Sequence, residues 1–228
     1  MVTQIKIRAE TPRVSERVAT VKIPGMVESR IATANVFRQL SEAADRCEHT
    51  NGSRDQEVAK FAAVCNSPDV RDVCGAVGIA SFRKEDDPKS YMTEVVRVFA
   101  IVIAERYLHG LISKSVADVS AAIRDFRAII DSSENRETIR RMGVKFGNTP
   151  YNAGELMLAT VINDIFNRYA AASIAGNEEV MTAQVGRFNE FSSSQSFVRA
   201  VCEVTKVDAT HTVSMGDLVV RYRTFSDS

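Results

Sequence analysis

Hydrophobic residues recur at helical spacing through most of this chain, from Val27 to Phe191. The pattern is clearest in residues 152–175, where large apolar side chains share one face and polar side chains share the other. The apolar face has Leu158, Ile162, Ile165, Phe166 and Tyr169, and the opposite face has Asn163, Asp164, Asn167 and Arg168. A period near 3.6 residues is typical of helices that bury one face. The sequence therefore predicts a mainly α fold, a single helical domain of about seven or eight helices.

Both ends of the chain show a different period, because apolar and polar residues alternate there as in β-strands. Residues 3–10 and 17–24 alternate near the N-terminus, and residues 196–207 and 211–225 do so near the C-terminus. We expect three regions, which are an extended arm or β-hairpin over 1–25, a helical core over 26–192, and β segments or an arm over 193–228. Such arms can pair within one subunit or add a strand to a neighbouring copy, and the sequence leaves both arrangements open.

Charge is balanced across the chain, with 29 Lys and Arg residues against 29 Asp and Glu residues. No global field therefore draws the protein to nucleic acid or to a membrane. The bases are nevertheless unusual, because 21 are Arg and 8 are Lys. Arg makes planar, bidentate contacts with carboxylates and with phosphates that Lys cannot make. The excess of Arg has two interpretations. One is a codon or lineage bias together with ion pairs between subunits, and the other is contact with nucleic-acid phosphates.

The stretch RRMGVKFGNTPYNAGELM, residues 140–157, combines three bases with three glycines just before a helical pattern. It does not match a nucleotide-binding P-loop, because Asn148 stands where the loop needs Lys. A helix start explains the stretch better, with Thr149 or Asn152 as the N-cap residue. The bases in front of that helix are suited to holding a backbone phosphate near its N-terminus.

Basic residues are concentrated between positions 124 and 145, on two predicted helices and the segment after them. We predict that five of them bind nucleic acid, each neutralising one phosphate. They are Arg124, Arg127, Arg140, Arg141 and Lys145. The alternative is a solvated helix face with ion pairs inside the subunit. Phe126 and Phe146 lie among these bases and are candidates either for stacking on bases or for the protein core.

Sequence motifs of common enzyme classes are missing. The three histidines, His49, His109 and His211, have no second ligand at metal-binding spacing, and no G-x-S-x-G elbow occurs. The four cysteines show no C-x-x-C pair, so we expect them to be small buried side chains in a reducing compartment. They are Cys47, Cys65, Cys74 and Cys202. We predict no catalytic residues, no metal and no small-molecule cofactor; an active site assembled from distant residues is the remaining enzymatic alternative.

Apolar runs in this sequence are short. The N-terminal residues MVTQIKIRAETPRVSERV contain no apolar segment of signal-peptide length, and no run approaches the 18 or so apolar residues of a membrane span. We therefore expect a soluble, cytoplasmic protein, or one that is packed in a virion, with no membrane partner.

A neutral helical subunit with extended ends and a local cluster of Arg can polymerise while it holds nucleic acid along its backbone. The function we predict is a self-assembling nucleocapsid or coat-type structural protein that packages RNA without sequence specificity. Its partners would be the RNA backbone and other copies of itself, which it could contact through the terminal arms. The alternative is a soluble helical scaffold or adaptor that acts through protein–protein contacts alone.

Overall fold

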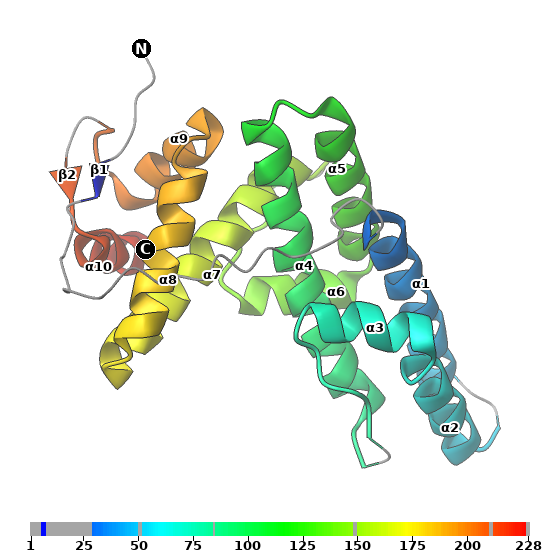
Figure 1. The fold of residues 1–228 in the computed structure, drawn as a ribbon. Coiled ribbons are helices and arrows are strands. Elements are labelled where there is room, and N and C mark those ends of the chain that lie inside the picture. The colour runs from blue at the N-terminus through cyan, green and yellow to red at the C-terminus, as the bar shows by residue number, and fades with distance from the viewer. Residues whose placement is uncertain are drawn as a thin grey trace. The chain divides into compact units, whose positions relative to one another are not determined.

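Helices make up most of this computed structural model, which describes residues 6–7, 29–49, 52–83, 85–147, 150–209 and 212–226 (Figure 1). Ten helices and two short strands occur within these ranges. The helices are α1 Ser29–Glu48, α2 Arg54–Cys65, α3 Pro68–Ala76, α4 Pro88–Ile112, α5 Val116–Ile130, α6 Ser133–Arg141, α7 Ala153–Ala175, α8 Glu178–Phe191, α9 Gln195–Thr205 and α10 Met215–Ser226. The strands are β1 Lys6–Ile7 and β2 Thr212–Val213. The mainly α prediction is confirmed.

The chain divides into two compact units, each with its own packing. Unit 1 contains Met1–Arg17, Ile103–Phe126 and Arg140–Ser228, and unit 2 contains Val18–Val102 and Arg127–Ile139. The predicted helical core, residues 26–192, contributes to both.

Unit 2 contains α1, α2 and α3, which pack on one another, together with the first part of α4, the end of α5 and most of α6. An aromatic cluster fills part of its interior, where the rings of Phe61, Phe82 and Tyr91 meet edge to face with centroids 5.0–6.0 Å apart. The Cys65 and Cys74 thiols are buried near Tyr91, and burial raises the pKa of Cys65 to about 12. Cys47 is also buried, so the prediction of buried cysteines is confirmed for these three residues.

Unit 1 is organised around α7, which packs against α8, α9 and α10. Its ends follow from the sequence. The Asn152 side chain accepts hydrogen bonds from the backbone N–H groups of Gly154 and Glu155, and Gly176 ends the helix in the left-handed conformation. The apolar face of α7 is buried as predicted, and the Phe166 ring stacks on the Phe188 ring of α8 at 6.2 Å. Asn152 as the N-cap of this helix is confirmed.

The two C-terminal segments predicted as strands, residues 196–207 and 211–225, are mostly helical, because residues 195–205 and 215–226 form α9 and α10, whereas Thr212–Val213 form the short strand β2. The alternation that suggested strands coexists with a helical period. On α9 the side chains of Phe197, Val201 and Thr205 recur every four residues and are all buried, and the Ser194 side chain accepts from the backbone N–H of Phe197. Packing on α7 selects the helical period, and these two helices raise the number in the described ranges to ten.

A two-stranded parallel sheet joins β1 and β2, with Lys6 opposite Thr212 and Ile7 opposite Val213. The rest of the predicted N-terminal arm, residues 1–5 and 8–25, lies outside the described residues. None of the described helices has the length and apolar character needed to cross a membrane.

Candidate nucleic-acid interface

Four bases line one groove of about 920 Å³ in unit 1. Arg140 and Arg141 come from the last turn of α6, Lys145 from the loop that follows, and Arg223 from α10. All four residues are exposed. We call this site the basic groove, and its other lining residues are Met142, Gly143, Val144, Phe146, Asn163, Asn167 and Tyr222. The described residues of this lining include four bases and no carboxylate, although the whole chain is neutral.

The loop after α6 is held close to α7 by the conformation of Gly143. Its φ of 94° lies in a region that favours glycine, and its N–H donates to the Arg140 carbonyl at 2.8 Å. A Cβ at this position would stand 2.5 Å from the Asn163 amide nitrogen. Val144 is buried directly after it. This glycine therefore serves the turn that brings Lys145 beside the two arginines, and it does not form a P-loop.

Asn163 connects three walls of the basic groove. Its side chain is buried on α7, where its amide nitrogen donates to the Met142 carbonyl of the loop. Its amide oxygen accepts from the Tyr222 hydroxyl of α10 at 2.6 Å and from Asn167 at 3.1 Å. The sequence placed Asn163 on the outward face of its helix, and this expectation is wrong because α10 and the loop cover that face. The groove is therefore preformed by a buried polar network.

Aromatic side chains lie among the bases. The Arg140 guanidinium carbon is 5.1 Å from the centre of the half-buried Phe146 ring, a cation–π distance that orients the arginine. The Tyr222 ring packs edge to face on Phe166 at 5.1 Å. Phe126, the second aromatic residue that the sequence offered for base stacking, is fully buried in the core and cannot serve.

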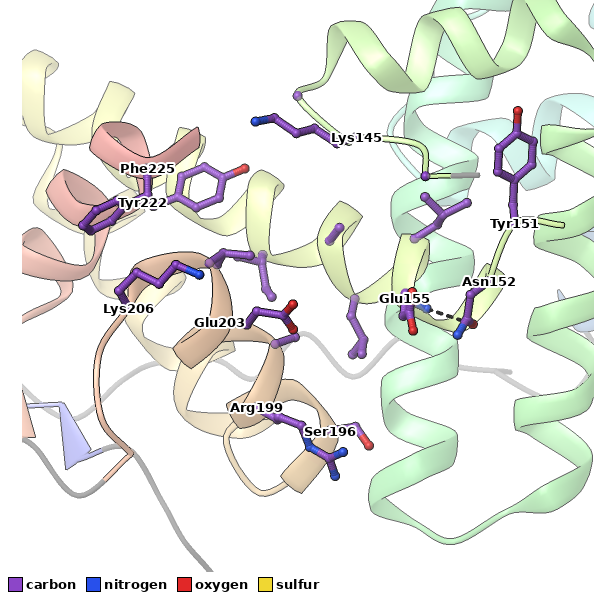
Figure 2. Close-up of a pocket in the computed structure, with 18 of the residues that line it drawn as sticks. Lys145, Tyr151, Asn152, Glu155, Ser196, Arg199, Glu203, Lys206, Tyr222 and Phe225 are labelled. Carbon is purple, nitrogen blue, oxygen red and sulfur yellow. Dashed lines mark hydrogen bonds between the residues drawn. The ribbon is translucent and has the colours of Figure 1, made fainter. Parts of the chain in front are cut away.

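A second pocket, of about 750 Å³, adjoins the basic groove and shares Gly143, Lys145 and Tyr222 with it. We call it the α7–α9 pocket. Figure 2 shows Tyr222 and Phe225 of α10 near one end, Tyr151 and Asn152 near the other, and α9 side chains between them. Its apolar lining is Leu156, Leu158, Ala159, Ile162, Ala200 and Val204, and its charged lining is Lys145, Glu155, Arg199, Glu203 and Lys206.

The structure brings together three of the five predicted bases, namely Arg140, Arg141 and Lys145. Arg124 is an exposed residue of α5 in unit 1, with its Nε 3.3 Å from Asp125, and it does not line the groove. Arg127 is an exposed residue of α5 in unit 2. Arg223 was not among the predicted bases of this site, because residues 211–225 were predicted to form a strand.

The expected pairing of these bases with a helix N-terminus is not found. Arg140 and Arg141 occupy the C-terminal turn of α6, where positive charge complements the helix dipole. At the start of α7, the Asn152 side chain already accepts from two of the first N–H groups, and the Glu155 carboxylate adds negative charge. Phosphate binding at this site would therefore depend on side-chain charge.

Several other arginines form ion pairs within unit 1. Arg187 of α8 bonds to Glu105 of α4 and to Asp164 of α7, with 2.9 Å between Nη1 and the Asp164 carboxylate. Burial lowers the pKa of Arg187, but the Glu105 and Asp164 carboxylates raise it by more, to above its ordinary value. Arg106 pairs with the buried Asp125. Part of the excess of Arg is thus explained by intramolecular ion pairs.

Metal-binding geometry does not occur among the described residues, where no three His, Cys, Asp or Glu side chains are grouped as ligands. His109 lies 3.6 Å from the Glu190 carboxylate and packs edge to face on Phe191 at 5.3 Å.

No known protein family, curated protein or solved structure matches this chain. Function is therefore inferred from the chemistry of the basic groove and the α7–α9 pocket.

Proposed function

We propose that this chain is a self-assembling nucleocapsid or coat-type subunit that packages RNA through its phosphate backbone, without sequence specificity. The observation that carries the proposal is the basic groove, which four exposed bases line and which a buried polar network preforms. Such a subunit would act in the cytoplasm and in the assembled particle.

The chemistry of the groove suits a phosphate backbone. Three of its bases are Arg, whose planar guanidinium donates two parallel hydrogen bonds to a phosphate. Each neutralised phosphate releases counterions, which supplies most of the affinity when no base is read. Because the chain as a whole is neutral, copies that stack along one strand would not repel one another through their net charge.

Two features of the described residues support self-association. The sheet of β1 and β2 has two strands, and the free edge of such a sheet is a template for adding a strand from another copy. Val116 and Ile174 in unit 1 are large apolar side chains that are 79% and 82% exposed, so each offers apolar surface to a partner. The same exposed residues favour the second candidate function, a helical scaffold that acts through protein contacts alone.

Salt dependence separates the two functions. We expect the chain to bind an oligouridylate of about 20 nucleotides, with log K falling against log salt at a slope of about −2.8 if four phosphates are neutralised. Between about 50 and 200 mM salt this slope weakens binding about 50-fold. Fluorescence anisotropy with labelled RNA measures this salt dependence. A mixed-sequence RNA of equal length should bind with an affinity within a few-fold of that of the oligouridylate.

An acidic peptide of equal charge is the matched competitor in this titration. Preference for the peptide, or RNA affinity that does not change with salt, would contradict the nucleocapsid proposal and favour the scaffold.

A further inference from the structure

We infer that the α7–α9 pocket receives unpaired bases of the strand whose phosphates lie in the basic groove, and that Phe225 is the surface on which a base stacks. This inference rests on the proposed function. It adds the ligand class, single-stranded nucleic acid, and a base-binding site beside the phosphate-binding one.

Continuity between the two sites is the first argument. Gly143, Lys145 and Tyr222 line both the basic groove and the α7–α9 pocket. A strand that follows Arg140 and Arg223 past Lys145 therefore reaches the pocket without leaving the protein surface. Figure 2 shows the Lys145 side chain extending over the pocket, across from Lys206, which directly follows α9.

Aromatic and apolar surface is the second argument. Phe225 is 42% exposed on α10, and it lines the pocket together with Tyr151 and Tyr222. Every nucleobase has a π-face, so stacking on such rings adds affinity without selecting a sequence. Tyr151 and Tyr222 are half-buried whereas Phe225 is exposed, so Phe225 is the ring with most surface to offer.

The distribution of charge is the third argument. The α7–α9 pocket contains the carboxylates of Glu155 and Glu203, whereas the basic groove contains none among its described lining residues. Carboxylates repel phosphates, but they accept hydrogen bonds from the amino groups of bases. Phosphates therefore fit the basic groove, while bases fit the pocket, with Arg199 and Lys206 placed to balance its acids. A duplex would not bind in this way, because its bases are already stacked and paired.

The test uses two probes of equal length, an oligouridylate and an abasic oligonucleotide that keeps the phosphates and lacks the bases. Phe225→Ala should weaken binding of the oligouridylate by roughly 5- to 150-fold, the effect of one stacked base, and leave the abasic probe unchanged. Phe225→Trp should retain oligouridylate binding. Val220→Ala is the matched control, since Val220 is 65% exposed on the same helix and lines neither site.

Each contrary result identifies what has failed. Unchanged oligouridylate affinity in Phe225→Ala, or an equal loss with the abasic probe, would overturn the base-stacking role and leave the proposed function standing. If neither probe binds the wild-type protein, the proposed function fails and this inference fails with it. A thermal unfolding scan of each variant, which should match that of the wild type, keeps a folding defect from being mistaken for lost binding.

Discussion

We expect that neutralising the basic groove abolishes most RNA binding. The variant Arg140→Gln/Arg141→Gln/Lys145→Gln/Arg223→Gln should bind an oligouridylate at least about 10⁴-fold more weakly than the wild type, because each of the four lost charge-assisted contacts costs about 1.5 kcal/mol or more. The slope of log K against log salt should become less steep by about 2.8, which is about 0.7 for each phosphate contact on a single strand. Fluorescence anisotropy in low salt, followed by a salt titration, measures both quantities.

The matched control removes four exposed bases that lie outside the groove, in the variant Arg38→Gln/Lys60→Gln/Arg71→Gln/Arg83→Gln. Its net charge changes equally, so a similar loss of affinity would mean that overall charge, and not the groove, binds RNA. Arg124 and Arg127 remain predicted contacts. If α5 also touches the strand, the wild-type slope should be about −4.2 for six contacts, and the double Gln variant should reduce its magnitude by about 1.4.

Loss of the Arg187 ion pairs should destabilise unit 1 strongly for a single substitution. Arg187→Leu leaves the Glu105 and Asp164 carboxylates without their shared partner, and Asp164 is only 7% exposed. We expect the free energy of unfolding to fall by about 3 kcal/mol, at the low end for buried ion pairs because Glu105 is 28% exposed. Urea denaturation followed by circular dichroism measures the change.

Arg168→Gln is the control for this prediction, because Arg168 pairs with the same Asp164 at 2.8 Å but is 51% exposed. Its cost should stay below about 1 kcal/mol. If Arg187→Leu proved no more destabilising than Arg168→Gln, the network would not stabilise unit 1.

Periodicity was sufficient to predict most helices, and its failures have a local cause. Residues 152–175 show a single helical period of apolar side chains and have a capping residue at each end, Asn152 and Gly176. The bounds of α7 were therefore predicted almost correctly. In α10 the side chains of Met215, Leu218 and Val219 fall at i, i+3 and i+4 and are buried. That helical signal was present in the sequence, but alternation of Tyr222 and Phe225 with arginines matched a strand equally well.

The basic groove was predictable only in the part that is contiguous in sequence. Arg140, Arg141 and Lys145 are neighbours along the chain, so their clustering follows from the sequence alone. Arg223 joins them through tertiary packing, because Asn163 of α7 binds both the loop and Tyr222. No local pattern shows that a polar residue on a helix will be buried by two distant segments.

Size-exclusion chromatography with light scattering tests most directly whether this chain assembles on RNA. The protein is purified in low salt, and the ratio of nucleic-acid to protein absorbance is recorded across each peak. We expect large particles that contain nucleic acid and fall apart in high salt or on ribonuclease treatment, whereas the variant with four Gln in the basic groove should elute without nucleic acid. A wild-type monomer or dimer free of nucleic acid under these conditions would contradict the claim.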